Sequence, residues 1–411
     1  MYWRKNAEIE FFAVDVNHQR KGYGAIMLTR ALEMVFQKTD ADFAYLYAVD
    51  WNAKGQSFYK KYGMEQNGHS YQIKINDYSE GKSMSIIRTH DITLYGGSDI
   101  DIVLRPLCDD HLPLLYKWCA DPEVLYWTEG GTNDLNLSYG PDTVHMIYGG
   151  ISQDNFCFLV EADGVPIGEC WLQKMNLPEV KAMYPESLDV RRIDMSIGEK
   201  SYWNKGIGTQ FIGMMIDFAF NGENVDVLHC FCEDYNVRSR RMWEKHGLTR
   251  ILEEPLEPQP QKGKWQYHYR ITRQEYIERR RVKIPAEKRF MIPIADLQPS
   301  QLYISEGKLR LVREWFNPGD MDGFDPIPVK QFNDKTLMTD GHTRAVAACL
   351  ADLERVPVYW DEDELDMRAY AIDIKWCGEE GIYSPIDLAG RIVTHKDYER
   401  LWRKRCMEMI L

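Results

Sequence analysis

The sequence predicts an α/β protein of the α+β kind, with a mixed central sheet, a partial copy of that sheet at the N-terminus and a smaller α+β domain at the C-terminus. Three observations predict it: an order of strand, glycine loop and helix that occurs twice, turn-rich segments between the copies, and a change of pattern near residue 280. A chain of 411 residues is long enough for two or three domains, each with its own core. We therefore expect domains at residues 1–95, 96–280 and 281–411.

The first copy of the pattern occupies the N-terminal segment. A strand pattern at 7–16 leads through the loop QRKGYGA into a helix at 25–38, whose apolar residues recur at intervals of three and four. A second strand at 43–50 follows, and then a helix that Asn52 caps and Gly63 ends. The segment therefore predicts half of an α/β domain, because no further strands precede it.

The same order returns near the middle of the chain. A strand pattern at 193–203 ends in the loop NKGIGT, which runs into the helix 210–220, a further strand and the helix 236–248. Ahead of this copy lie a helical stretch and a hairpin whose turn is built on Asp163 and Gly164. The second copy is therefore the one expected to form a complete domain.

From about Pro285 the pattern changes to a smaller α+β region. An arginine-rich helix at 271–283 reads as a linker into it. Strands at 325–330 and 356–363 flank a helix at 345–353, and a helical tail rich in Trp and charge ends the chain. This order predicts a third domain with its own small sheet.

Composition favours a soluble protein of a reducing compartment. Hydrophobic residues make up 44% of the chain and charged residues 27%, as in ordinary globular domains. Because no membrane-length apolar run and no signal-peptide pattern are present, we expect a cytoplasmic protein without membrane association. The nine scattered cysteines predict structural thiols and no metal site. The net charge of -13 argues against a nucleic-acid partner and mildly favours cationic ligands.

The glycine loop predicts a phosphate-binding site. In WNKGIGT, Gly206 and Gly208 stand between a strand and a helix, where backbone N–H groups converge and the helix dipole adds partial positive charge. G-x-G alone is weak evidence, because a tight turn explains it as well or better, but both loops are followed by Asn-x6-aromatic-x3-Gly. That pattern falls at Asn52, Tyr59 and Gly63 in the first copy and at Asn236, Trp243 and Gly247 in the second.

These elements resemble the GNAT superfamily of acetyl-CoA-dependent N-acetyltransferases, whose Gln/Arg-x-x-Gly-x-Gly/Ala loop binds the pyrophosphate of coenzyme A. Gln19, Gly22 and Gly24 match that motif fully, whereas Trp203 replaces the Gln/Arg in the second copy. The span 101–273 resembles one branch, the aminoglycoside 6'-N-acetyltransferases, in segments such as GVPIGECWLQ and RRIDMSIGEKSYWNKGIGT. The resemblance implies transfer of an acetyl group from acetyl-CoA to a small-molecule amine.

The resemblance also implies contacts to coenzyme A in both copies. In the second copy the implied residues are Met195, Ser196, Asn204, Lys205, Gly206, Ile207, Gly208, Thr209 and Asn236. In the first copy they are Gln19, Gly22, Gly24, Asn52 and Tyr59. A backbone N–H near Met195 or Ser196 would stabilise the oxyanion. Asn236 is equally compatible with ordinary helix capping.

Acetyl transfer needs a base for the ammonium group, a donor for the oxyanion and a route for the leaving thiolate. Asp194 in RRIDMS is the predicted base, although it could instead pair with Arg192. The superfamily often protonates the thiolate with a Tyr seven residues after the Asn, which is Tyr59 in the first copy. The second copy has Trp243, which has no acidic proton, so water or Tyr235 is the expected donor unless the thiolate departs unprotonated.

The acceptor site is expected in the segments before the loop. Trp127, Glu129, Glu186 and Asp189 stand where aminoglycoside enzymes place the aromatic and acidic groups that receive a polycationic sugar. Exposed loop charge would explain the same acids. We expect a small polycationic amine, with an aminoglycoside as the first candidate and polyamines, lysine side chains and peptide amines left open.

The third region resembles the ParB/sulfiredoxin-like fold in LMTDGHTRAVAA. Asp340, Gly341, His342, Thr343 and Arg344 occupy the turn that binds nucleotide phosphates in that fold. The resemblance implies a nucleotide site or, equally, a structural or partner-recognition module. It leaves an alternative function open, a nucleotide-dependent phosphotransferase or sensor with the acetyltransferase part in a regulatory role. The sequence is also compatible with a homo-oligomer.

Overall fold

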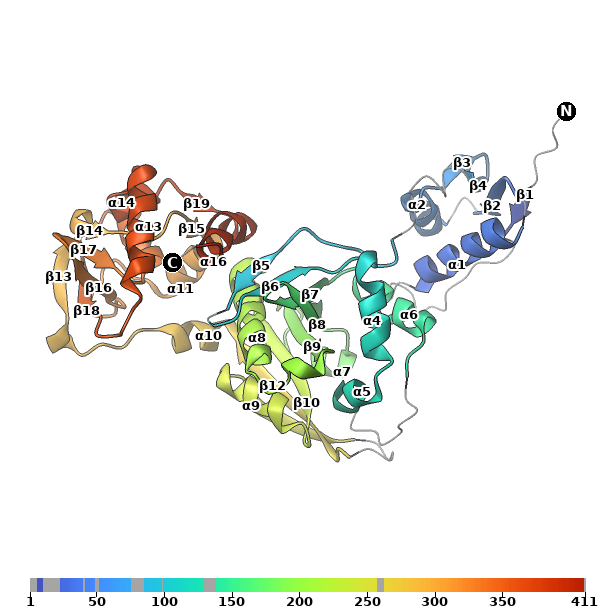
Figure 1. Ribbon diagram of the computed structural model, residues 1–411, viewed down its shortest axis with the longest axis horizontal. Helices are drawn as coiled ribbons and strands as arrows, with labels where there is room; N and C mark the ends of the chain where they lie inside the picture. Colours follow the sequence, from blue (N-terminus) through green and yellow to red (C-terminus); the bar gives the residue numbers. More distant parts are fainter. Residues whose placement is uncertain are drawn as a thin grey trace. The chain divides into compact units, whose positions relative to one another are not determined.

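The chain forms two compact units, and Figure 1 labels their elements in chain order. The computed structural model describes residues 6–9, 23–39, 41–48, 52–74, 85–97, 99–128, 138–256 and 262–409. Unit 1 comprises Met1–His90, Leu107–Leu125 and Asp134–Cys157. Unit 2 comprises Asp91–Pro106, Tyr126–Asn133 and Phe158–Leu411. The division into domains at 1–95, 96–280 and 281–411 stays a prediction.

Unit 2 is built around an eight-stranded mixed sheet in the order β11-β12-β10-β9-β8-β7-β6-β5. Its strands are β5 (Leu94–Gly96), β6 (Ile102–Pro106), β7 (Phe156–Ala162), β8 (Val165–Lys174), β9 (Val190–Ile197), β10 (Val227–Glu233), β11 (Thr249–Pro255) and β12 (Trp265–Thr272). β9 and β10 run parallel, whereas β8 with β9, β10 with β12 and β11 with β12 are antiparallel. The predicted hairpin turn is confirmed, since Asp163 and Gly164 have φ of 48° and 75°.

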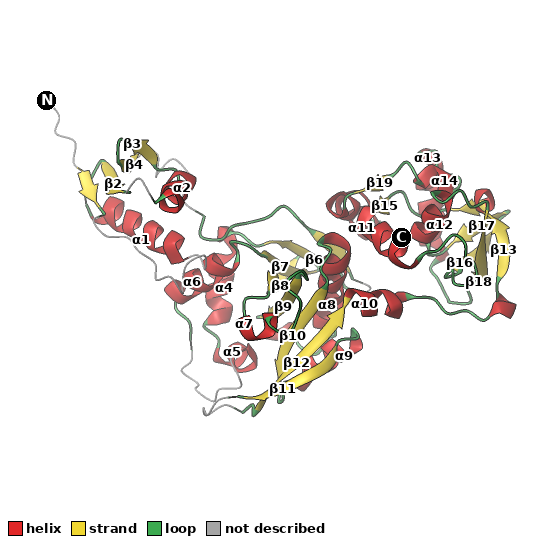
Figure 2. Cartoon of the chain, turned by 180° about the vertical axis from the view of Figure 1, so that it is seen from behind, coloured by secondary structure: helices red, strands yellow, loops and turns green. Residues whose placement is uncertain are grey.

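Three helices follow the strands of the second copy. They are α8 (Ile207–Asp217), which continues into the π-helix η4 (Phe218–Gly222), α9 (Val237–Lys245) and α10 (Arg273–Arg280). Figure 2 shows α8 and α9 beside the long strands of the sheet. α8 buries one apolar face, which includes Phe211, Ile212 and Met215, because its apolar residues return every three or four positions.

Unit 1 holds a four-stranded sheet in the order β1-β2-β4-β3. Its elements are β1 (Asn6–Glu8), α1 (Tyr23–Lys38), β2 (Phe43–Tyr47), α2 (Ala53–Lys61), β3 (Glu65–Asn67), β4 (Ser70–Lys74), α4 (Leu112–Cys119) and α6 (Pro141–Ile151). β1 and β2 are parallel, and β4 is antiparallel to both β2 and β3. The order and directions equal those of β9, β10, β12 and β11. The predicted internal repeat is therefore confirmed in its topology.

The repeated Asn-x6-aromatic-x3-Gly pattern forms the same helix in both copies. Asn52 and Asn236 cap α2 and α9, and each side chain accepts the N–H three residues on, at 3.0 and 3.2 Å. The aromatic residues Tyr59 and Trp243 are 6% and 2% exposed. Gly63 and Gly247 end the helices at φ of 77° and 86°, where a Cβ would be strained. The sequence pattern is thus the signature of a capped helix whose aromatic residue lies in the core.

The C-terminal part of unit 2 is a separate mixed sheet covered by helices. The sheet has the order β13-β18-β16-β17-β14, with a second pair β15-β19. The strands are β13 (Phe290–Pro293), β14 (Leu297–Gln298), β15 (Ile304–Ser305), β16 (Ile327–Phe332), β17 (Lys335–Met338), β18 (Arg355–Trp360) and β19 (Ile392–Val393). The helices are α11 (Glu306–Trp315), α12 (His342–Cys349), α13 (Met367–Glu379), α14 (Pro385–Leu388), α15 (His395–Tyr398), η7 (Glu399–Arg403) and α16 (Lys404–Met407). The predicted elements of this region are present with shifted bounds: β16 and β18 are the two strands, and α12 begins three residues earlier and ends four residues earlier than expected.

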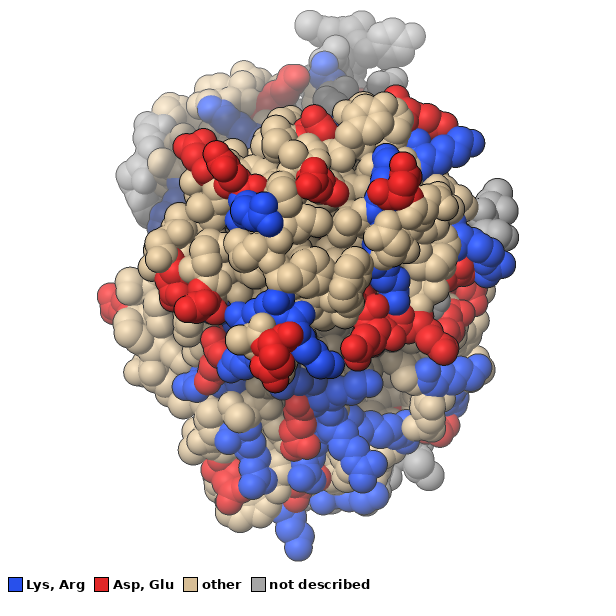
Figure 3. Space-filling model, turned by 90° about the vertical axis from the view of Figure 1, so that its left-hand side faces the viewer, with Lys and Arg blue, Asp and Glu red and all other residues tan. Residues whose placement is uncertain are grey.

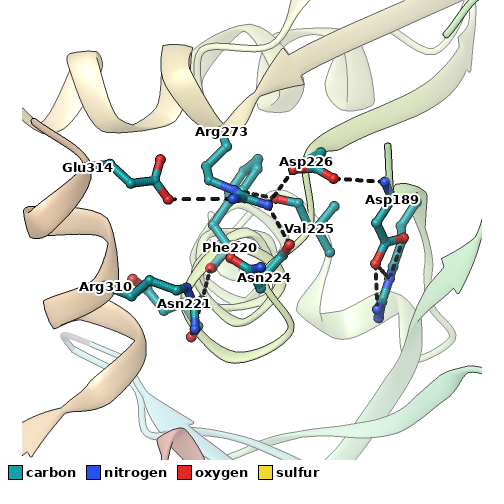
Figure 4. Close-up of polar contacts among 10 residues, drawn as sticks. Asp189, Phe220, Asn221, Asn224, Val225, Asp226, Arg273, Arg310 and Glu314 are labelled. Atoms are coloured by element: carbon teal, nitrogen blue, oxygen red, sulfur yellow. Dashed lines mark hydrogen bonds and ion pairs between the residues drawn. The ribbon is translucent and has the colours of Figure 1, made fainter. Parts of the chain in front are cut away.

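The arginine-rich helix α10 is a packed element and not a free linker. Tyr276 and Ile277 are both 5% exposed. Arg273, at its first turn, donates to the carbonyl oxygens of Asn224 and Val225 and pairs with Asp226, as Figure 4 shows. The prediction of a linker rests on the many arginines of this segment. Its buried face has only two residues, Tyr276 and Ile277, which is too few to give a clear apolar pattern in the sequence.

All nine cysteines lie in the described part of the chain, and none of them forms a disulfide there. Within that part, no helix is long and apolar enough to cross a membrane.

Candidate functional site

Strands β9 and β10 separate after two residue pairs. They are in register only at Val190 with Val227 and at Arg191 with Leu228, although β9 continues to Ile197 and β10 to Glu233. On its other side β9 stays paired with β8 from Arg191 to Ile197. The backbone of β9 beyond Arg191 therefore faces a gap in the sheet. Such a gap can accept an extended, amide-bearing ligand that hydrogen-bonds as a strand would.

Alternate residues of β9 direct their backbone groups into this gap. Because the backbone groups of successive strand residues point to opposite neighbours, Met195 and Ser196 face opposite sides of β9. Ser196 faces β8, because a Cβ at Gly168 would come within 2.1 Å of the Ser196 carbonyl oxygen. Of the two predicted oxyanion donors, the structure points the N–H of Met195 into the gap and turns that of Ser196 away.

The glycine loop forms the start of α8 at the end of β9. Gly206 caps the helix at φ 75°, and Asn204 also lies in the left-handed region, at φ 62°. Asn204, Lys205 and Gly206 are exposed, and no side chain caps the helix. The N–H groups and the positive end of the dipole are therefore accessible to an anion.

Gly208 faces β9 in the first turn of α8. A Cβ at this position would make an ordinary van der Waals contact with Cε of Met195, at 3.4 Å. Ile207 is buried and Thr209 half-buried, so the predicted loop residues divide into an exposed segment before the helix and a packed first turn. Exposed backbone on a packed helix is the arrangement that phosphate-binding loops require.

Trp203, the departure from the loop motif, closes the end of β9. Its Nε1–H donates to the carbonyl oxygen of Ile197 at 2.7 Å. Arg238 of α9 lies between two indoles, 5.5 Å from the ring centroid of Trp203 and 4.4 Å from that of Trp127. The guanidinium of Arg238 therefore lies next to the loop, although Trp203, at the Gln/Arg position of the motif, carries no charge. Sequence reasoning missed Arg238, whose only signal was its place in the first turn of α9.

Asp194 lies on β9, whose backbone faces the gap. It also forms the ion pair with Arg192 that the sequence left open as the alternative to a base. Its carboxylate is 34% exposed, and Oδ2 lies 2.9 Å from Nε of Arg192. Oδ2 also accepts a hydrogen bond from Nε2 of Gln173 at 2.6 Å. Because both contacts use Oδ2, they orient the carboxylate and direct Oδ1 elsewhere.

Tyr235 and Asn236 hold the end of α5 (Pro122–Thr128). The Tyr235 hydroxyl donates to the carbonyl oxygen of Tyr126 at 2.8 Å, and its ring stacks on Trp127 with centroids 5.8 Å apart. Nδ2 of Asn236 donates to the carbonyl oxygen of Trp127 at 3.4 Å. The structure therefore brings Trp127 to these two residues. The Tyr235 proton is already donated, so an acid role would first require that bond to break.

Trp243 is buried with an unused donor. Its Nε1 has no hydrogen-bond partner in the described part of the chain. A buried donor without an acceptor costs about 1–3 kcal/mol, so it favours a ligand acceptor at this position. Its counterpart Tyr59 keeps a hydroxyl, whose pKa burial raises above the ordinary value.

The structure does not gather the predicted acceptor acids. Glu186 is exposed, and Glu129 lies outside the described residues. Asp189, drawn in Figure 4, binds Arg191, with Oδ2 at 2.8 Å from Nη2, and Arg191 also pairs with Glu223 at 3.1 Å. Asp189 precedes β9, about 16 Å along the strand from Asp194.

In the first copy only part of the predicted site can be located. Asn52 is the cap of α2 and Tyr59 is in the core, while Gly24 lies in the first turn of α1. Gln19 and Gly22 lie outside the described residues.

The predicted nucleotide turn is assembled, but its polar groups are used within the fold. Gly341 caps α12 at φ 81°, and Thr343 follows in the first turn. Arg344 is buried and donates Nη1–H to the carbonyl oxygens of Asp325 and Pro326, at 3.2 and 3.1 Å. Asp340 and His342 lie beside it.

His342 is part of the same internal network. Its Nε2 accepts the N–H of Ser300 at 3.0 Å, and burial lowers the pKa of the imidazole to about 4. The Asp340 carboxylate is exposed, and it lies 3.6 Å from Nη2 of Arg344. The arrangement braces the turn, and the carboxylate would oppose a phosphate.

Comparison with known proteins identifies the two copies. Residues 101–249 match the model of the acetyltransferase (GNAT) domain, and residues 1–64 match the model of the acetyltransferase (GNAT) family. The chain is 24% identical over 161 residues to the aminoglycoside N(6')-acetyltransferase type 1 of Klebsiella pneumoniae, covering 37% of this chain and 76% of that protein. The same values hold for an N-acetyltransferase 9-like protein of Nematostella vectensis.

Among solved structures, an uncharacterized protein from Bacillus halodurans is 13% identical with a TM-score of 0.38, covering 46% of this chain and 94% of that one. AAC(6')-Ib in complex with ribostamycin and coenzyme A is 21% identical with a TM-score of 0.36, covering 44% of this chain and 99% of that one. On the family models, the chain carries two segments of GNAT acetyltransferase type, and it is an acyltransferase.

Proposed function

We propose that the larger GNAT segment transfers an acetyl group from acetyl-CoA to a primary amine of a small polycationic acceptor. One observation carries the proposal: the gap between β9 and β10 opens beside the uncapped start of α8. Coenzyme A combines an anionic pyrophosphate with an extended arm that bears two amides. The exposed loop at Gly206 suits the first part, and the unpaired backbone of β9 suits the second.

The proposed chemistry uses Asp194 and Met195 of β9 and the buried indole of Trp243 in α9. Oδ1 of Asp194 takes the proton from the ammonium group, and the free amine attacks the thioester carbon. The N–H of Met195 stabilises the oxyanion. The C–S bond of the tetrahedral intermediate then breaks, the nitrogen gives its second proton to water, and the leaving thiolate takes a proton from water, with the N–H of Trp243 as a hydrogen-bond donor to the sulfur.

An aminoglycoside is the first candidate acceptor. The support is the named activity of the Klebsiella relative, which this chain resembles at 24% identity, together with the half-buried indole of Trp127 beside Tyr235. Asp189 gives no support, because Arg191 occupies it. Polyamines and peptide amines therefore stay in the test.

The test is an amine panel with acetyl-CoA, read by release of free thiol. The panel contains aminoglycosides, spermidine and lysine peptides. No thiol release above hydrolysis with any amine would contradict the proposal.

Replacing Asp194 with Asn tests the base. Turnover should fall about 100-fold because general-base catalysis is worth roughly that factor, while the dissociation constant of acetyl-CoA should stay unchanged. Asp154→Asn, at an exposed turn position, is the matched control and should keep full turnover. Equal turnover in both variants would remove Asp194 from the mechanism.

The alternative, a nucleotide-dependent activity of the C-terminal region, has weaker support. Arg344 is the cation that would receive a phosphate, and two carbonyl oxygens already occupy it. Calorimetric titration of nucleoside triphosphates into the full chain tests the alternative, and micromolar binding would restore it.

A further inference from the structure

We propose that α8, α9 and α10 form a binding site for a small anion, a phosphate or a compact phosphate ester, separate from the loop at Gly206. The three helices line a half-open surface pocket of about 260 Å³, called the cavity below. Its polar lining consists of Asp217, Lys245, His246, Tyr276, Arg279 and Arg280. It lies beside Gly213, about 10 Å along α8 from Gly206.

The cavity has more positive than negative charge. Its only carboxylate among the lining residues, Asp217, pairs with Arg280 and accepts the Tyr276 hydroxyl at 2.9 Å. Lys245 and Arg279 therefore add positive charge that no lining carboxylate neutralises. Figure 3 shows Lys and Arg side chains gathered in the lower part of the face it draws. On a chain with a net charge of -13, such a local excess attracts anions.

Arg279 is held in place by contacts that the fold provides for it. Its Nη2 donates to the carbonyl oxygen of Lys245 at 2.7 Å, at the end of α9. A Cβ at Gly247 would meet Cδ of Arg279 at 2.6 Å, so the glycine both ends α9 and makes room for this side chain. A guanidinium fixed through one N–H group keeps further donors for an oxyanion.

His246 forms the wall between the cavity and the loop. Its Nε2 donates to the carbonyl oxygen of Thr209, in the first turn of α8, at 2.8 Å. A Cβ at Gly213 would lie 3.0 Å from its ring, so only a glycine leaves the imidazole undisturbed. Burial lowers the pKa of His246, and the lysine and the arginines alone supply charge at neutral pH. An anion here would thus act, through one side chain, on the helix that carries the glycine loop.

The size of the cavity limits the ligand. Sites for drug-sized ligands occupy roughly 300–1,000 Å³, and this one is smaller. A tetrahedral oxyanion fits and can take paired hydrogen bonds from a guanidinium. The phosphate could be inorganic, or part of a small metabolite, and inorganic phosphate serves as the probe for both.

Calorimetric titration of inorganic phosphate into the full chain tests the site. Wild type should bind, and the double variant Lys245→Gln, Arg279→Gln should bind at least about tenfold more weakly, as expected for the loss of two charge-assisted contacts. Lys283→Gln is the matched control, because that lysine pairs with Glu278 outside the cavity. Circular dichroism checks folding, and Arg279→Lys, which keeps the charge, should retain part of the affinity. Equal affinity in the double variant and wild type would overturn the proposal.

A second titration separates this site from coenzyme A itself. The affinities for coenzyme A and for dephospho-coenzyme A are measured in wild type and in the double variant. If the site is separate, the ratio of these two affinities should be the same in both proteins. If the double variant loses affinity for coenzyme A alone, the cavity receives a phosphate of coenzyme A and the separate site is refuted. This site's link to catalysis rests on the proposed function, but phosphate binding does not, so a failed acetyl transfer leaves the binding test intact.

Discussion

At the scale of single residues, the two copies differ most at one aromatic position. Tyr59 and Trp243 occupy the same place in the same capped helix, and both are buried. The hydroxyl of Tyr59 could lend a proton, whereas the indole can only donate a hydrogen bond. The copy with the complete sheet therefore carries the weaker donor, and its N–H lacks a partner in the described part of the chain.

Trp243→Phe tests that donor. Because it removes an unsatisfied buried N–H and keeps an aromatic ring, we expect thermal stability within about 1 kcal/mol of wild type. Turnover should fall about tenfold if the N–H stabilises the leaving sulfur. Tyr59→Phe removes the polar hydrogen of the corresponding aromatic residue in the first copy, and it should leave turnover unchanged. A loss of turnover in Tyr59→Phe alone would move the activity to the first copy.

At the scale of elements, α8 connects the glycine loop to the C-terminal region. It continues into η4, and Nη2 of Arg310 in α11 donates to the carbonyl oxygens of Phe220 and Asn221, at 3.1 and 3.2 Å (Figure 4). Gly307 lets α11 approach this closely, because a Cβ there would lie 1.7 Å from the carbonyl oxygen of Asn221. The start of α11 therefore packs directly on the backbone of η4, the continuation of α8.

Gly307→Ala should destabilise this contact. Alanine favours a helix, but the Cβ meets backbone that cannot rotate away, and we expect a loss of about 1–3 kcal/mol in the free energy of unfolding. Gly378→Ala is the control: that glycine is also helical, and a Cβ there meets nothing within 4 Å. The control should be neutral or stabilising by up to about 1 kcal/mol. Urea unfolding of both variants checks this, and equal stability would refute the clash.

At the scale of the whole molecule, the C-terminal helices cover an edge of the large sheet. β5 is the last strand on that side. The Glu399 carboxylate accepts the N–H of Tyr95 at 3.0 Å, and Nε of Arg403 donates to the Tyr95 carbonyl oxygen at 3.2 Å. Two side chains thus satisfy backbone groups that another strand would otherwise pair, which protects the edge from association.

This edge contact predicts a pH dependence of stability. Burial raises the pKa of Glu399 to about 7, so the folded state holds a proton that the unfolded state releases near its ordinary, lower pKa. The contribution of Glu399 to stability is therefore present at low pH and is lost as pH rises toward 7, by up to about 3 kcal/mol. Glu399→Gln should be more stable than wild type at pH 8 and similar to it at pH 5. Nε2 of His395 lies 3.8 Å from Oε1 of Glu399, but burial lowers the pKa of His395 to about 4, so the imidazole is neutral at both pH values and does not contribute to the difference. Thermal unfolding at both pH values measures it, and a constant difference would refute the assignment.

The sequence by itself determined the repeated order of elements, the caps at Asn52 and Asn236, and the glycine turns, because these depend on residues within a few positions of one another. Only the tertiary structure decided how the site is assembled. Arg238 reaches Trp127 and Trp203 across the fold, Asp189 is taken by Arg191, and β9 leaves β10 after two pairs. Such contacts join segments far apart in the chain, and local spacing carries no record of them.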